Sequence, residues 1–96
     1  NVIHIAPFAV AEGIISGAAK ALARGGLLIF YGPFKENGAH TANSNADFDV
    51  RLRDENPDWG IRDVDDLTAL ADDAGLDFQS LQEMPANNRL LVFIKA

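Results

Sequence analysis

The sequence has 96 residues, which is enough for one small domain and too few for a two-domain enzyme. Its formal charge is −6, from 8 Lys and Arg against 14 Asp and Glu, so the basic face that nucleic acid or an anionic membrane requires is excluded. The absence of cysteine excludes disulfides, Cys-ligated metal sites and thiol nucleophiles. A hydrophobic content of 48%, without any long apolar stretch, predicts a soluble, globular, cytoplasmic chain.

The first third of the sequence predicts a strand, a helix and a second strand. The β-branched run Val2–Ile5 is typical of a strand, and apolar residues at four-residue spacing predict a helix over Phe8–Leu22. The uniformly apolar run Leu27–Tyr31 predicts a strand that is buried on both faces and pairs in parallel with the first. The sequence begins at Asn1 rather than at Met, directly before a predicted strand, which we interpret as a fragment boundary.

The rest of the sequence predicts two helices followed by an antiparallel pair of strands. The polar residues Asn43–Asn45 can cap a short helix, and Asp63 is the predicted N-cap of another helix that Gly75 ends. The runs Phe78–Met84 and Leu90–Ile94 predict two strands with a short connection, which favours antiparallel pairing. The chain is therefore predicted to be an open α/β sheet that ends in an antiparallel hairpin.

Ligands of open α/β sheets bind beyond the carboxyl ends of the strands, which singles out the loops after residues 5 and 31. Asn87 and Asn88, in the hairpin connection, could lie at either end of the sheet. His4 could act as a general base or as a hydrogen-bond donor to a substrate, or it could be a buried histidine with a backbone partner. Tyr31 and Trp59 could wall an aromatic pocket or simply pack, and Asn43–Asn45 could contact substrate or cap a helix.

Metal and nucleotide sites have little support in this sequence. The acidic residues near Asp63 match no calcium loop, and His4 and His40 are too far apart in sequence to form a local metal motif, so no metal site is predicted. No glycine-rich loop follows a strand and precedes a helix, so no phosphate-binding motif is present.

Several segments together resemble one known family. The sequence is similar to the methyltransferase-like protein 26 family, long described as a domain of unknown function within the superfamily that uses S-adenosylmethionine (SAM). The resemblance covers essentially the whole sequence, and its segments are jointly specific: Asn1–Phe8, Leu27–Phe34, Ser44-Asn45 with Phe48-Asp49, Trp59–Asp63 and Glu83–Asn88.

The resemblance implies the C-terminal half of a Rossmann-like SAM-dependent methyltransferase fold, with strands four to seven present and the seventh antiparallel between the fifth and sixth. It implies that residues 1–96 are the substrate-side portion of one domain, without the N-terminal half that binds the cofactor. Ala6, Pro7 and Phe8 would then lie near the methyl group of SAM, with His4 just before them as the candidate base. The implied acceptor side consists of Tyr31, Gly32, Pro33, Phe34, Asn43, Ser44, Asn45, Trp59, Asn87 and Asn88.

The expected function is transfer of a methyl group from SAM to a small-molecule acceptor by the intact protein, the present chain alone being inactive. The alternative is a non-catalytic binding or assembly module with the same fold. Half of an NAD-dependent oxidoreductase would share the architecture but has no supporting residue pattern. An unpaired strand at Val2–Ile5 would favour self-association, so a homodimer through this region is also expected.

Overall fold

The computed structural model describes residues 3–4 and 6–96. Its elements, in chain order, are α1 (Phe8–Ala21), β1 (Leu27–Gly32), α2 (Asn43–Glu55), α3 (Val64–Ala74), β2 (Leu76–Met84), the short 3-10 turn η1 (Pro85–Asn87) and β3 (Asn88–Lys95). From residue 8 onward the type and order of these elements match the prediction, with small differences at their ends. None of the described helices combines the length and the apolar character needed to cross a bilayer.

The described strands form one antiparallel sheet in the order β1-β3-β2. Leu27, at the start of β1, pairs with Ile94 near the end of β3, and Met84 at the end of β2 pairs with Asn88 at the start of β3. The turn η1 between β2 and β3 makes this pairing local. The predicted antiparallel hairpin is therefore confirmed, and its second strand lies in the middle of the sheet.

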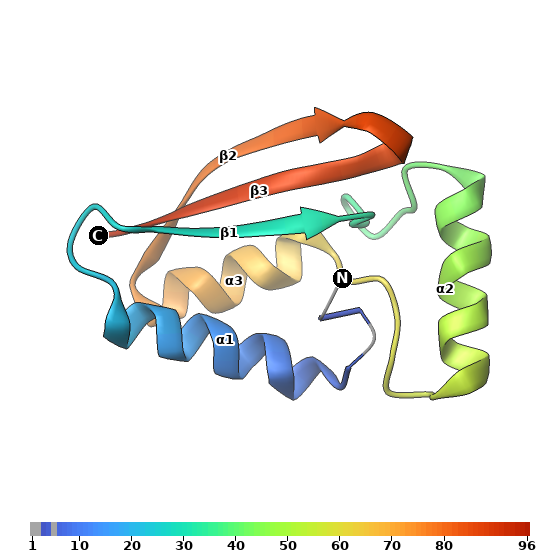
Figure 1. Ribbon diagram of the computed structural model, residues 1–96, viewed down its shortest axis with the longest axis horizontal. Coiled ribbons are helices and arrows are strands. Elements are labelled where there is room, and N and C mark those ends of the chain that lie inside the picture. The colour runs from blue at the N-terminus through green and yellow to red at the C-terminus, as the bar shows by residue number, and fades with distance from the viewer. Residues whose placement is uncertain (1–2, 5) are drawn as a thin grey trace.

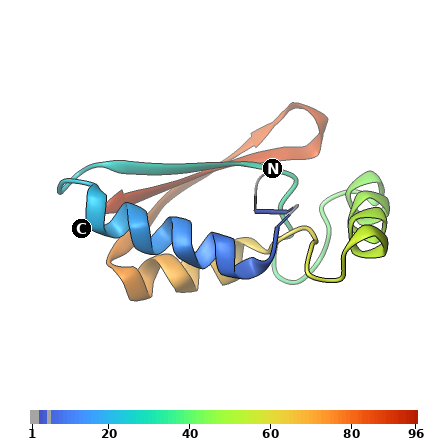
Figure 2. The same cartoon turned by 60° about the horizontal axis from the view of Figure 1, so that its bottom comes forward.

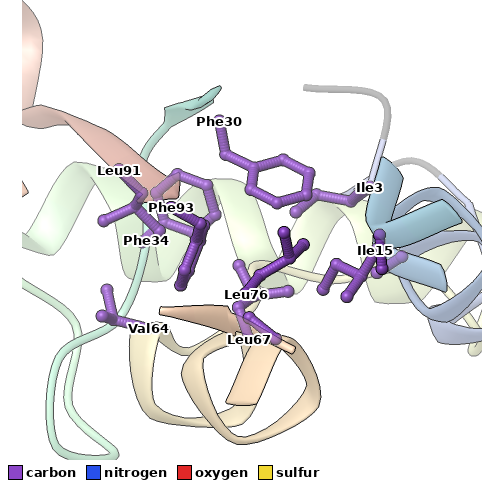
Figure 3. Close-up of a cluster of buried hydrophobic side chains, with 12 residues drawn as sticks. Ile3, Ile15, Phe30, Phe34, Val64, Leu67, Leu76, Leu91 and Phe93 are labelled. Carbon is purple, nitrogen blue, oxygen red and sulfur yellow. The ribbon is translucent and has the colours of Figure 1, made fainter. Parts of the chain in front are cut away.

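Helices α1 and α3 cover one face of this sheet, whereas α2 stands apart near the end of β1 (Figures 1 and 2). The covering helices place small and aliphatic residues at helical spacing toward the sheet, including Ala11 and Ile15 from α1 and Leu67 from α3. Figure 3 shows Ile15 and Leu67 together with Phe30 and Phe93 from the strands in one hydrophobic cluster. Burial of this cluster provides the main driving force for folding.

The opposite face of the sheet is apolar but exposed. Leu27, Ile29 and Tyr31 of β1 are 50%, 53% and 47% exposed. The prediction that residues 27–31 are buried on both faces is therefore wrong for this chain. The reason is that both covering helices of the described chain lie on the other face (Figure 2).

The two predicted helix caps have different outcomes. The Asp63 side chain accepts a hydrogen bond from the Asp65 N–H at 2.8 Å, and Gly75 ends α3 in the left-handed conformation at φ 89°, as predicted. Helix α2 instead begins after Ala42 without a side-chain cap, so the capping prediction for Asn43–Asn45 is wrong. The Asn45 side chain is used elsewhere, as described below.

The predicted strand Val2–Ile5 is not supported where the structure describes it. Ile3 and His4 lie in a turn, and residues 1, 2 and 5 are outside the described residues. The carbonyl of His4 accepts a hydrogen bond from the Gly60 N–H at 2.8 Å, so its backbone is engaged by the loop before α3. Burial of Ile3 and His4 thus explains an apolar pattern that resembled a strand. Self-association through Val2–Ile5 falls largely outside the described residues and stays a prediction.

Candidate functional site

Four polar residues from three segments lie together at the end of β1, and we call them the polar cluster: Tyr31, Asn45, Asn87 and Asn88. The amide of Asn88 donates a hydrogen bond to the Tyr31 hydroxyl at 3.3 Å, and the amide of Asn45 donates to the Asn87 carbonyl at 3.3 Å. Asn45 also donates to the Thr41 hydroxyl at 3.2 Å. The structure therefore places the hairpin connection at the same end of the sheet as the predicted loops, a point that sequence spacing left open.

His4 lies fully buried in the turn before α1. Its Nδ1 accepts a hydrogen bond from the Arg62 N–H at 3.1 Å, and its ring packs edge-on against Phe34 with the centroids 5.0 Å apart. Burial lowers the pKa of His4 from 6.5 to about 4, and the Arg62 guanidinium acts in the same direction. At neutral pH the imidazole is therefore uncharged.

The hydrogen bond to His4 also determines where the imidazole carries its hydrogen. Because Nδ1 accepts, we assign the hydrogen to Nε2, a buried atom without a partner among the described residues. This tautomer makes His4 a hydrogen-bond donor at Nε2. The structure thus confirms the reading of His4 as a buried histidine with a backbone partner, and a role as base or donor toward a substrate stays a prediction.

Arg62 holds the turn that contains His4. Its Nε donates to the Ile3 carbonyl at 2.9 Å, and its Nη2 donates to the carbonyls of Ala6 at 2.6 Å and Asp58 at 2.8 Å. Its guanidinium also lies 5.3 Å from the ring centroid of Phe8. One side chain thus fixes both sides of the turn in which the resemblance places the methyl-transfer residues.

Asp49 forms a second buried centre on α2, only 7% exposed. Its Oδ1 accepts hydrogen bonds from the Ile61 N–H at 2.7 Å and the Arg53 Nε at 3.2 Å, while the Nε2 of His40 lies 3.4 Å from its Oδ2. Burial alone would raise the pKa of Asp49, but the donors from Ile61 and Arg53 outweigh it and lower the pKa. A Cβ at Gly60 would lie 2.9 Å from Oδ1, so this approach requires glycine.

The remaining predicted site residues are distributed between the core and the surface. Gly32 at the end of β1 and Pro33 and Phe34 directly after it are buried, and the Phe34 ring belongs to the hydrophobic cluster. Asn43 and Ser44 are exposed on the first turn of α2. Trp59 is half-buried and Pro7 is exposed, and Pro7 directly precedes α1.

Arg62, Asp49 and His40 were not singled out as site residues from the sequence. A usable signal existed for Asp49, because Asn45, Asp49 and Leu52 fall on one helical face and all three are buried. A carboxylate at such a position requires donors, and the sequence alone could not identify them. Arg53 lies one helical turn further along α2, but the backbone donor comes from Ile61, in a loop that is distant in sequence.

The fold places this chain in a known class: it matches the C-terminal part of SAM-dependent O-methyltransferases. An O-methyltransferase family 2 protein from Planctomyces limnophilus, solved in complex with apigenin, matches with a TM-score of 0.87 at 16% identity over 100% of this chain and 29% of its own. Human N-acetylserotonin methyltransferase, solved with SAM, gives 0.84 at 13% identity over 100% and 28%. The protein TnmH gives 0.76 at 22% identity over 100% and 29%.

The chain thus spans less than a third of the length of these proteins. At the level of family, residues 1–95 match the model described as "Protein of unknown function (DUF938)". The chain belongs to this family.

Proposed function

We propose that this chain is the acceptor-side part of a SAM-dependent methyltransferase of the methyltransferase-like protein 26 type. In the complete protein it would receive a small-molecule acceptor, while segments beyond residues 1–96 would bind most of the cofactor. The observation that carries this proposal is the fold match over the whole chain to O-methyltransferases, at TM-scores up to 0.87. The cofactor assignment is supported by relatives solved with SAM and with S-adenosylhomocysteine.

The turn at residues 6–8 would be this chain's contact with the reacting end of the cofactor. Arg62 holds the Ala6 carbonyl, and the buried Nε2–H of the neighbouring His4 is a donor without a partner among the described residues. An unfilled buried donor beside a fixed turn fits a polar ligand, because a buried polar group is stable only when it is hydrogen-bonded. When bound, SAM supplies an electrophilic methyl group on a sulfonium.

The polar cluster would bind the acceptor. Within the cluster, Asn88 donates to the Tyr31 hydroxyl and Asn45 donates to the backbone carbonyl of Asn87, each at 3.3 Å; these bonds are long and can be exchanged for bonds to a ligand. The protein's task in such a reaction is mainly to position the acceptor and exclude water. A small molecule is the acceptor class that fits, since the negative charge of the chain disfavours nucleic acid.

Titration calorimetry of the full-length protein with SAM and S-adenosylhomocysteine tests this function. We expect saturable binding of both, followed by transfer of a labelled methyl group from SAM to compounds in a deproteinised cell extract. Absence of binding to either molecule would overturn the proposal. Binding without transfer to any compound would instead favour a binding module with the same fold.

A further inference from the structure

A groove between α1 and α3 takes no part in the proposed function. Its volume is about 340 Å³, and we call it the acidic groove. All its lining residues belong to these two helices: Glu12, Ile15, Ser16, Leu70, Asp73 and Ala74. We propose that the acidic groove binds a basic amphipathic helix of another protein. This inference is independent of the proposed function, because none of the lining residues belongs to the polar cluster or to the turn before α1.

The acidic groove has an apolar floor and a negative rim. The floor consists of Ile15, which is buried in the hydrophobic cluster, and of the half-buried Leu70 and Ala74. Glu12 on α1 and Asp73 on α3 are exposed and place one carboxylate on each wall. Such a groove fits a ligand that buries aliphatic side chains on the floor and presents cations at both edges.

The charges on the rim are not compensated within the described part of the chain. Neither Glu12 nor Asp73 takes part in any of its salt bridges. Asp73 also lies, with Asp72, in the last turn of α3, where there is no basic residue. The carbonyl end of a helix carries a partial negative charge, so acids there destabilise the helix. A cation from a partner would remove this repulsion, which the packing of α3 does not require.

The shape of the acidic groove favours a helix as its occupant. Helices α1 and α3 lie side by side on one face of the sheet (Figures 1 and 2), and the side chains of a third helix can pack into the groove between two such helices. Apolar side chains at helical spacing would reach the floor, and flanking lysines or arginines would meet the two carboxylates.

The partner has to be a different protein, because this chain offers no suitable helix. Helix α1 has one acidic and one basic residue, and in α2 and α3 the acidic residues outnumber the basic ones. None of the described helices is therefore basic, so a second copy of the chain would bring like charges together at the groove. Nucleic acid and anionic membranes are disfavoured for the same reason.

Fluorescence anisotropy with the full-length protein and a labelled peptide tests the proposal. The probe is a short amphipathic helix of leucine and lysine, and the control peptide has glutamate in place of each lysine. We expect saturable binding of the basic peptide, weaker at higher salt because charged groups make the contacts, and no binding of the acidic peptide. A basic peptide that does not bind, or equal binding of both peptides, would overturn the proposal.

Charge reversal then shows where the basic peptide binds. Glu12→Lys combined with Asp73→Lys should weaken its binding about tenfold, because two attractions become repulsions. Asp72→Lys is the matched control for Asp73→Lys, since both residues are exposed in the last turn of α3 and only Asp73 lines the groove. Equal weakening by these two single variants would mean a general attraction to negative charge and would contradict a site in the groove.

Filling the acidic groove tests its apolar floor without changing the charge. Ser16→Trp places a large ring in the groove from an exposed position, so we expect binding of the basic peptide to weaken about tenfold. Ala21→Trp, exposed at the end of the same helix and outside the groove, should bind as the wild type does. Wild-type affinity in Ser16→Trp would rule out a helix seated on the floor.

Discussion

The two histidines of this chain have opposite chemical environments, and both are linked to the loop at residues 60–62, His4 directly and His40 through Asp49. His4 is fully buried, and its Nδ1 accepts from the Arg62 backbone, so its free nitrogen is a donor. His40 is partly exposed, and its Nε2 lies 3.4 Å from the Asp49 carboxylate, while its Nδ1 is buried without a partner among the described residues. The comparison teaches that the partner of one imidazole nitrogen determines what the other nitrogen can do.

The loop at residues 60–62 builds both environments. The Arg62 N–H donates to His4, the Ile61 N–H donates to Asp49, and the Gly60 N–H donates to the His4 carbonyl. Three consecutive backbone donors thus link the turn before α1 to helix α2. Variants of this loop can therefore separate what the His4 region and the Asp49 region each contribute to the free energy of unfolding.

The largest effect is expected for Arg62→Ala. This change removes three hydrogen bonds to backbone carbonyls and leaves the buried Ile3 carbonyl without its donor, so we expect the free energy of unfolding to fall by about 3 kcal/mol. Arg62→Lys should recover only part of it, because a lysine cannot reproduce the planar fork. Urea denaturation of the full-length protein measures the stability of both variants. Equal stability of Arg62→Ala and wild type would show that Arg62 does not hold the turn.

Gly60→Ala should act mainly by disturbing the hydrogen bonds of the Asp49 carboxylate. The new Cβ would lie 2.9 Å from the Asp49 Oδ1 and 3.2 Å from the Arg53 Nε, and the backbone at residue 60 has φ 155°. We therefore expect the free energy of unfolding to fall by about 2 kcal/mol. Gly38→Ala is the matched control, because its φ is 79° but a Cβ there meets nothing within 4 Å. A smaller loss in Gly60→Ala than in Gly38→Ala would contradict the close approach.

The depressed pKa of His4 predicts a pH dependence of stability. As the pH falls below 6.5 the unfolded chain takes up a proton at His4, whereas the folded chain does so only near pH 4. The free energy of unfolding should therefore fall by about 1.4 kcal/mol per pH unit, or about 2 kcal/mol between pH 6.5 and 5. Denaturation of the wild type and of His4→Gln across this range should show the steeper dependence of unfolding free energy on pH only in the wild type. Equal slopes in the two proteins would contradict the low pKa of His4.

The smallest effect is expected in the polar cluster. Tyr31→Phe removes a hydroxyl that accepts one long, exposed hydrogen bond from Asn88, so the unfolding free energy should change by less than about 0.5 kcal/mol. Thermal unfolding of the full-length protein is sufficient to measure this. A loss above about 1 kcal/mol would show that the cluster stabilises the fold and is not free to bind a ligand.

Local patterns predicted most of the elements and some of the site. The hairpin and the caps at Asp63 and Gly75 follow from residues that are close in sequence, and all are confirmed. The predicted strand at Val2–Ile5 is wrong at the two described residues, 3 and 4, which lie in a turn. The predicted cap at Asn43–Asn45 is wrong because α2 has no side-chain cap and Asn45 instead donates to the Asn87 carbonyl. Asp49 was not predicted as a site residue because its backbone donor, Ile61, lies twelve positions away, beyond any helical period.

By itself, the sequence determined the class of fold, the net negative charge and the residues at the ends of the strands. Hydrophobic periodicity, charge and turn chemistry are local properties, so they can be read without coordinates. Only the tertiary structure decided which face of the sheet is covered and which nitrogen of each histidine is free. Both depend on partners distant along the chain, and packing of the whole domain brings those partners together.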